Sequence, residues 1–118
     1  MADSAIFIGF GLPMRGREQQ ALTVFSEALE YYTRLQQQGE IESFEPVLLE
    51  PHGGDLSGFF LIRGSQAQVA AVRGSEEFER QIARGQLIVE NIGIVGAAVG
   101  ERLASHMALY TTQLEELT

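Results

Sequence analysis

The chain has 118 residues, no cysteine, eight basic residues that are all arginine, sixteen acidic residues and a formal net charge of -8. These counts exclude disulfides, thiolate nucleophiles, cysteine-ligated metals and any lysine-based Schiff-base or phosphate-loop chemistry, and the acidic charge argues against a nucleic-acid partner. The length predicts one domain over residues 1–118. The longest nearly uncharged apolar run, residues 91–100, is too short to span a bilayer, so we expect no membrane partner and a cytoplasmic location.

Two strands and a helix are predicted in the first half of the chain. Ala5–Phe10 is a continuous apolar run that predicts a buried strand leaving into a loop. Glu18–Gln38 carries apolar residues at helical spacing, and Gly39 supplies its end. Ile41–Glu50 predicts a second strand, at a sheet edge or with a bulge because Pro46 has no N–H to donate.

The next segment predicts a hairpin followed by an interrupted helix. Pro51–Asp55 is a dense run of turn residues that leads into a third strand, Leu56–Arg63. Ser65 and Gln68 have the spacing of a capping box, which marks the start of a helix. Gly74-Ser75 interrupts that helix, and the acidic residues that follow predict a new start.

The last part of the chain predicts a strand and a helix. The interrupted helix ends at Gly85, and the fourth strand runs from Leu87 to about Ile94. A final helix begins near Val99 and carries an apolar seam made of Leu103, Met107, Tyr110, Leu114 and Leu117. We expect this seam to serve ordinary core packing, because two heptads are too few for an autonomous coiled coil.

The order strand, helix, strand, strand, helix, strand, helix predicts an α+β fold of the ferredoxin-like, split βαβ type. In this arrangement the helices cover one face of a four-stranded antiparallel sheet, and a C-terminal helix is added here. Alternate residues of a strand point to opposite faces, so Phe59 and Leu61 face away from Phe60 and Ile62. Both faces therefore need cover, and we expect a homodimer through the sheet face that the helices leave open.

Three stretches resemble segments of the dimeric alpha+beta barrel superfamily, whose small ferredoxin-like members face each other through their sheets. They are Gly58–Ser65, Ser75–Phe78 and Pro51–Asp55. The resemblance implies a homodimer but no single activity, since members include monooxygenases, haem-degrading enzymes, isomerases, ligand sensors and proteins without a known role. A histidine holds haem in the haem-degrading members, and His106 is the only helical candidate. The chain lacks the tryptophan of some of those enzymes, and we expect no cofactor.

Neither glycines nor histidines form a recognisable cofactor or metal motif. Gly9-Phe10-Gly11 follows a strand, but Met14 occupies the position of the third glycine in a dinucleotide fingerprint. His52 and His106 are far apart in the sequence, and neither has metal ligands at the usual spacing, apart from Asp55 near His52. We expect no metal, and the two histidines remain weak candidates for a catalytic base.

We expect a candidate anion site at one end of the predicted sheet. The exit of the first strand and the hairpin between strands two and three lie at the same end in a split βαβ fold, which brings Arg15 and Arg17 near His52 and Asp55. The positive charges of two arginines before a helix N-terminus interact unfavourably with the positive end of the helix dipole. They suit a bound anion, which the dipole also attracts. The alternative is a set of solvated loop charges.

Three further polar residues are expected at the opposite end of the sheet, near the close of strands three and four. They are Arg63, Glu90 and Asn91. We expect an ion pair between Arg63 and Glu90, within or between subunits, rather than catalysis.

The residues leave two functional classes open. One is a binding protein that holds a small, partly apolar or anionic ligand between sheet and helices, favoured by the aromatic residues Phe7, Phe10, Phe25, Tyr31, Tyr32 and Phe60. The other is a cofactor-independent monooxygenase or isomerase that uses His52 or His106 as its base. The sequence does not decide whether the protein is an enzyme.

Overall fold

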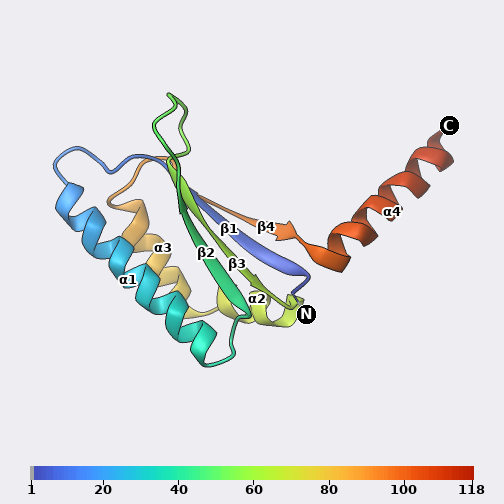
Figure 1. The fold of residues 1–118 in the computed structure, drawn as a ribbon, viewed down its shortest axis with the longest axis horizontal. Coiled ribbons are helices and arrows are strands. Elements are labelled where there is room, and N and C mark those ends of the chain that lie inside the picture. The colour runs from blue at the N-terminus through green and yellow to red at the C-terminus, as the bar shows by residue number, and fades with distance from the viewer. Residues whose placement is uncertain (1) are drawn as a thin grey trace.

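The computed structural model describes residues 2–118, which form one sheet and a set of helices in the predicted order (Figure 1). The strands are β1 (Ser4–Phe10), β2 (Ser43–Leu48), β3 (Gly58–Gly64) and β4 (Gly93–Ala98). The helices are α1 (Glu18–Gln37), α2 (Gln66–Arg73), α3 (Glu76–Gln86) and α4 (Gly100–Leu117).

The sheet has the strand order β2-β3-β1-β4, and every neighbouring pair is antiparallel. Helices α1, α2 and α3 lie on one face and leave the other open (Figure 1). This is the predicted ferredoxin-like arrangement. The register places the end of β1 beside the starts of β3 and β4, because Phe10 pairs with Gly58 and Gly9 pairs with Gly93. We call this the loop end of the sheet, and the opposite end, where α4 begins, the α4 end.

The main core lies between the sheet and the helices. Ile6, Ile8, Phe60 and Ile62 alternate along β1 and β3 toward the helices and are buried, and Tyr32 of α1 packs against them. A fully buried side chain of this size contributes about 1.5 to 3 kcal/mol relative to an exposed one. The alternation read from the sequence is therefore confirmed on this face.

The open face of the sheet is apolar as well. Phe7, Leu61 and Val95 are paired across three strands, and the rings of Phe7 and Phe59 lie with centroids 5.1 Å apart. Val95 is 56% exposed. Strands β1 and β3 thus carry apolar side chains on both faces, as the sequence indicates.

The helices are started and tied together by polar groups. The Ser65 hydroxyl accepts from the Gln68 N–H and the Gln68 amide accepts from the Ser65 N–H, which confirms the capping box at α2. Arg84 of α3 donates two hydrogen bonds to the Glu27 carboxylate of α1, at 2.8 and 3.1 Å. This bidentate pair holds α1 and α3 side by side over the sheet.

The fourth strand begins later than predicted. The apolar run Leu87–Val89 does not pair along β1, because its backbone N–H groups donate to carbonyls of Arg84 and Gly85 at the end of α3. Val89 forms only an isolated bridge with Pro13. Asn91 follows with a φ of 54°, in the left-handed region, which interrupts extended backbone before β4 can start at Gly93.

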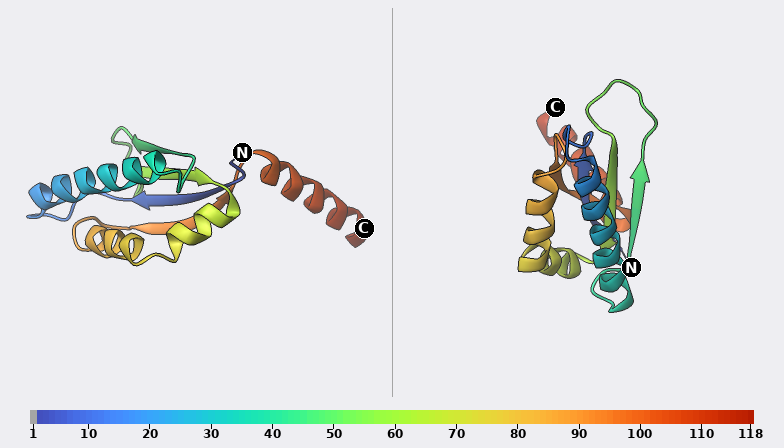
Figure 2. Two further views of the ribbon diagram at one scale, coloured as in Figure 1. Left: turned by 90° about the horizontal axis from the view of Figure 1, so that it is seen from below. Right: turned by 90° about the vertical axis from the view of Figure 1, so that its left-hand side faces the viewer.

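Helix α4 does not join the core, which corrects the expectation of ordinary core packing. It projects away from the body of the domain (Figures 1 and 2), and none of its residues is buried. Gly100 has a φ of 56°, and this left-handed residue turns the chain out of β4 into the helix. The periodicity of the seam was therefore informative about the helix but not about what it packs against.

Candidate ligand-binding site

A cavity of about 440 Å³ lies between α1, α3 and the sheet, at the loop end. Its lining is almost entirely apolar. The side chains come from β1, α1, α3, β3 and the connections around them, and they include Ile8, Phe10, Ala21, Phe25, Ala28, Tyr32, Phe60, Ile82, Ile88 and Ile92. A pocket of this size falls within the range of small-molecule sites in proteins, about 300 to 1,000 Å³.

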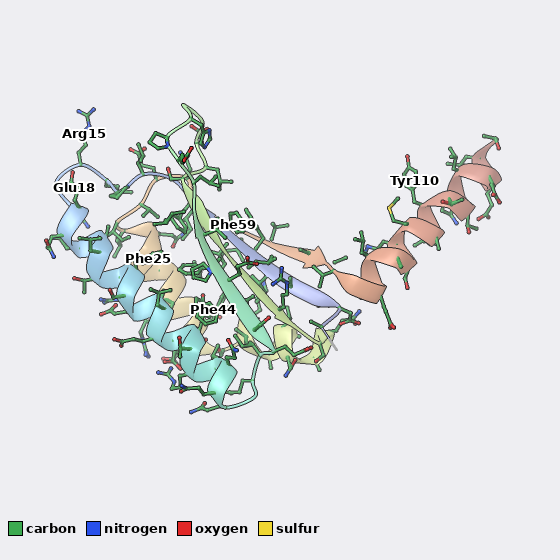
Figure 3. All side chains as sticks on the ribbon, in the orientation of Figure 1. Arg15, Glu18, Phe25, Phe44, Phe59 and Tyr110 are labelled. Atoms are coloured by element: carbon green, nitrogen blue, oxygen red, sulfur yellow. The ribbon has the colours of Figure 1, made fainter. Side chains whose placement is uncertain are left out.

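Aromatic rings make up one wall of the cavity. The Phe25 ring stacks on the Phe60 ring at a centroid distance of 5.4 Å, and the Phe10 ring meets Phe60 at 5.9 Å and Phe25 edge-on at 6.3 Å. Tyr32 closes the deep side, with its ring 5.5 Å from Phe60. Figure 3 shows Phe25 on the side of α1 that faces the sheet. Such a wall suits flat apolar or aromatic groups.

The mouth of the cavity is lined by exposed leucines. Leu12, Leu22, Leu48 and Leu49 belong to the lining and are between 38% and 69% exposed. We call these four residues the leucine rim. Isolated exposed leucines are common, but four around one opening form a continuous apolar entrance. The exposed part of the cavity lining is therefore apolar, as the buried part is.

Few polar groups reach the cavity. The Oε1 atom of Gln81 is buried and has no hydrogen-bond partner in the part of the chain that the structure describes. The Glu18 carboxylate at the entrance accepts from the Gly16 N–H at 3.0 Å. Burial raises the pKa of Tyr32, and the neighbouring Tyr31 raises it further, so the Tyr32 phenol is neutral at physiological pH.

Close backbone contacts define the loop end of the cavity. The Gly11 N–H donates to the Glu90 carbonyl at 2.7 Å. A Cβ atom at position 11 would lie 2.7 Å from that oxygen and 3.0 Å from the Asp55 carbonyl oxygen, so only glycine fits here. The exit of β1, the hairpin and the connection after α3 therefore converge at this residue.

The predicted anion residues share one end of the sheet but do not form one cluster. Arg15 is exposed and points away from the domain (Figure 3), and it makes no hydrogen bond or ion pair within residues 2–118. Arg17 donates from Nη1 to the Leu87 carbonyl at 3.0 Å. His52 Nε2 lies 2.7 Å from the Leu56 carbonyl oxygen, and Asp55 is exposed in the same hairpin. Binding of an anion by these residues stays a prediction.

The three residues expected at the other end are separated by the structure. Arg63 does lie at the α4 end, but its Nη1 atom is 3.3 Å from Glu45 Oε1 of the neighbouring strand. Glu90 and Asn91 lie at the loop end, where Glu90 bonds to Gly11 and Leu12. The expected Arg63–Glu90 pair is therefore absent within the chain. The reason is the late start of β4, which leaves residues 90 and 91 in the preceding connection.

Neither histidine lines the cavity. His52 belongs to the exposed hairpin, and His106 lies on the projecting helix α4. Among the described residues no group of three His, Asp or Glu side chains is placed to hold a metal ion. The bases expected from the sequence thus do not line the pocket in this chain.

Sequence reasoning missed Gln81 and the leucine rim. Gln81 falls on the same face of α3 as Phe78, Ile82 and Gly85, and a polar residue within an apolar helical stripe was the available signal. The leucine rim gave no comparable signal, because Leu12, Leu22 and Leu48 come from three separate segments.

Comparison with known proteins gives similarity at the level of structure. No protein-family model matches the chain, and no curated protein is similar to it. A dimeric protein of unknown function with a ferredoxin-like fold from Bacteroides fragilis superposes with a TM-score of 0.62 at 14% identity, covering 81% of this chain and 95% of the other. The chain has the ferredoxin-like fold.

Two enzymes share this fold. SnoaB from Streptomyces nogalater, a cofactor-independent oxygenase, superposes with a TM-score of 0.56 at 13% identity, covering 84% of this chain and 95% of SnoaB. A hydroxynitrile lyase from Passiflora edulis gives a TM-score of 0.62 at 14% identity, with coverages of 84% and 95%. Within the described residues, no helix combines the length and hydropathy needed to cross a membrane.

Proposed function

We propose that this protein binds a small, predominantly apolar molecule in the cavity between α1, α3 and the sheet. The observation that carries the proposal is the cavity of about 440 Å³ with its aromatic wall and apolar entrance. An empty apolar space of this size costs stability, because its lining lacks contacts that a ligand would supply. A bound apolar molecule restores those contacts.

The polar groups narrow the chemistry of the ligand. The unpartnered Gln81 Oε1 atom can accept a hydrogen bond, so a hydroxyl or N–H on an otherwise apolar ring system suits a cavity that Gln81 lines. A charged group buried there would lack compensation. An anionic substituent would have to remain at the mouth, beside the connection between Leu12 and Glu18 that carries Arg15 and Arg17.

A neutral probe tests the site. N-phenyl-1-naphthylamine, which carries two aromatic parts and one N–H, is expected to bind with an increase in its fluorescence. Ala28→Trp should fill the cavity from α1 and weaken binding by about tenfold or more. Ala70→Trp is the matched control, since Ala70 is exposed on α2 and is absent from the lining. Equal affinities for the parent and a folded Ala28→Trp variant would refute the cavity site, and Ala28→Leu replaces that variant if it does not fold.

An anionic probe tests the loop arginines separately. For 8-anilino-1-naphthalenesulfonate, Arg15→Gln with Arg17→Gln is expected to weaken binding by about threefold to tenfold. Binding of the neutral probe should be unchanged. Arg15→Gln alone leaves the Arg17–Leu87 bond in place, so it separates charge from structure. If both probes bind the double variant as they bind the parent, the arginines contribute nothing to the site.

A cofactor-independent monooxygenase or isomerase is the second candidate, favoured by the shared fold of SnoaB. It ranks below binding because neither His52 nor His106 belongs to the cavity lining. The titratable side chains of that lining are Glu18 and Tyr32. Of these, Glu18 at the entrance is the candidate for proton transfer in an enzyme of this kind.

We also infer that the chain forms a homodimer through the open face of the sheet. The face carries Phe7, Phe59, Leu61 and Val95, and the Bacteroides protein of the same fold is dimeric. The Arg63–Glu45 pair lies at its edge, where partial exposure keeps both charges hydrated. The composition is thus that of an apolar interface centre with a polar rim.

A further inference from the structure

We propose that α4 is an arm that docks its apolar seam on a second copy of the chain. The seam consists of Leu103, Met107, Tyr110, Leu114 and Leu117, and we call it the α4 seam. The proposal rests on the inferred dimer through the sheet face and adds to it a second contact that the sheets alone do not make.

The α4 seam has no cover within its own chain. Its five residues are between 50% and 85% exposed, and the helix packs beside β4. A helix of 18 residues is about 27 Å long, and an isolated helix of that size is marginally stable in water. An amphipathic helix gains its stability from packing its apolar face. Because no part of the domain covers that face of α4, we expect another molecule to cover it.

The direction of α4 matches the position of a sheet-face partner. In Figure 1 the helix leaves the α4 end on the side of the sheet opposite to α1 and α3, and Figure 2 shows it extending beyond the body of the domain. Figure 3 shows Tyr110 on the side of α4 turned toward the open face, where Phe59 lies. A second copy on the open face would therefore lie alongside the α4 seam, and one body would cover both surfaces.

Charge disfavours an anionic membrane surface as the partner of the α4 seam. Helix α4 carries Glu101, Glu115 and Glu116 against Arg102, and the whole chain has a net charge of -8, which repels anionic lipids. A two-fold axis through the sheet face would apply the contact twice, because each chain would present its arm to the other.

The experiment measures dimer affinity by sedimentation over a series of concentrations of the full chain. Met107→Asn with Leu114→Asn is expected to raise the dimer dissociation constant by about tenfold or more. Leu109→Asn is the matched control, because Leu109 is 59% exposed on the same helix but lies about 120° around it from the middle of the α4 seam. That control should change the constant by less than about twofold.

Two results would overturn the proposal: a seam variant that dimerises like the parent, and a Leu109→Asn variant that is weakened as much as the seam variant. Phe59→Asn on the open face separates this failure from that of the dimer itself. If Phe59→Asn dissociates the dimer and the seam variant does not, the dimer through the sheet face is supported and the docking of α4 is refuted. If the parent is a monomer at all concentrations, both the sheet-face dimer and the docking of α4 are refuted.

Discussion

Phe60→Ala is expected to lower the free energy of unfolding by about 3 to 5 kcal/mol, a large part of the stability of a domain of this size. Phe60 is 6% exposed and packs against the rings of Phe10, Phe25 and Tyr32. Its removal would deprive three aromatic neighbours of their shared contact and would enlarge the existing cavity. Urea unfolding followed by far-UV circular dichroism measures the loss.

Phe59→Ala is the matched control, one residue away on the same strand but on the opposite face. Phe59 contacts Phe7 on the open side of the sheet, so its truncation should act mainly on the dimer. The stability difference between this variant and the parent is expected to grow with protein concentration, whereas the loss in Phe60→Ala should be the same at all concentrations. A concentration-independent loss of equal size in both variants would contradict the assignment of the two faces.

Stability is expected to fall as the pH rises above 10. Burial raises the pKa of both Tyr31 and Tyr32, and a hydrogen bond from the Ser75 side chain lowers it in part for Tyr31. In the unfolded chain a tyrosine ionises near pH 10, about where the model peptides do. The unfolded state therefore releases protons before the folded state does, so the stabilisation is complete below pH 10 and is lost progressively as the pH rises toward the higher folded pKa values.

Tyr32→Phe tests whether ionisation of the buried tyrosines causes the loss of stability at high pH. The free energy of unfolding of this variant should fall less steeply between about pH 9 and 11 than that of the parent, because one buried ionising group is gone. A slope that is the same in the parent and in Tyr32→Phe would show that another process unfolds the chain at high pH.

The fold could be predicted because its signals are local. The apolar alternation of β3, the helical spacing of α1 and the Ser65–Gln68 capping box depend on residues close together in the sequence, and each lies where the pattern placed it. The start of β4 was wrong for a tertiary reason. Ile88 is buried in the cavity lining, so its segment covers the core beside α3 and leaves strand pairing to Gly93–Ala98.

The candidate site was only partly predictable. Six aromatic residues were expected to serve a ligand. Four of them line one cavity, namely Phe10, Phe25, Tyr32 and Phe60, whereas Phe7 and Tyr31 do not belong to its lining. Its volume and its mouth depend on how α1, α3 and two connections meet at Gly11, and no local pattern encodes that meeting. The error over Glu90 has the same source, since moving the start of one strand by a few residues moved the side chain to the other end of the sheet.

The alternation along β3 also constrains how the chain can change in length. Phe60 faces the cavity and Phe59 faces the open side of the sheet, so successive residues of β3 belong to two different apolar surfaces. Inserting or deleting one residue within β3 would move each following side chain to the opposite face of the sheet. Residues that line the cavity would then face outward, and residues of the open face would point toward the helices. The exposed tip of the hairpin before it, residues 50–54, has no such alternation to preserve, so changes of length in this part of the protein should be confined to that loop.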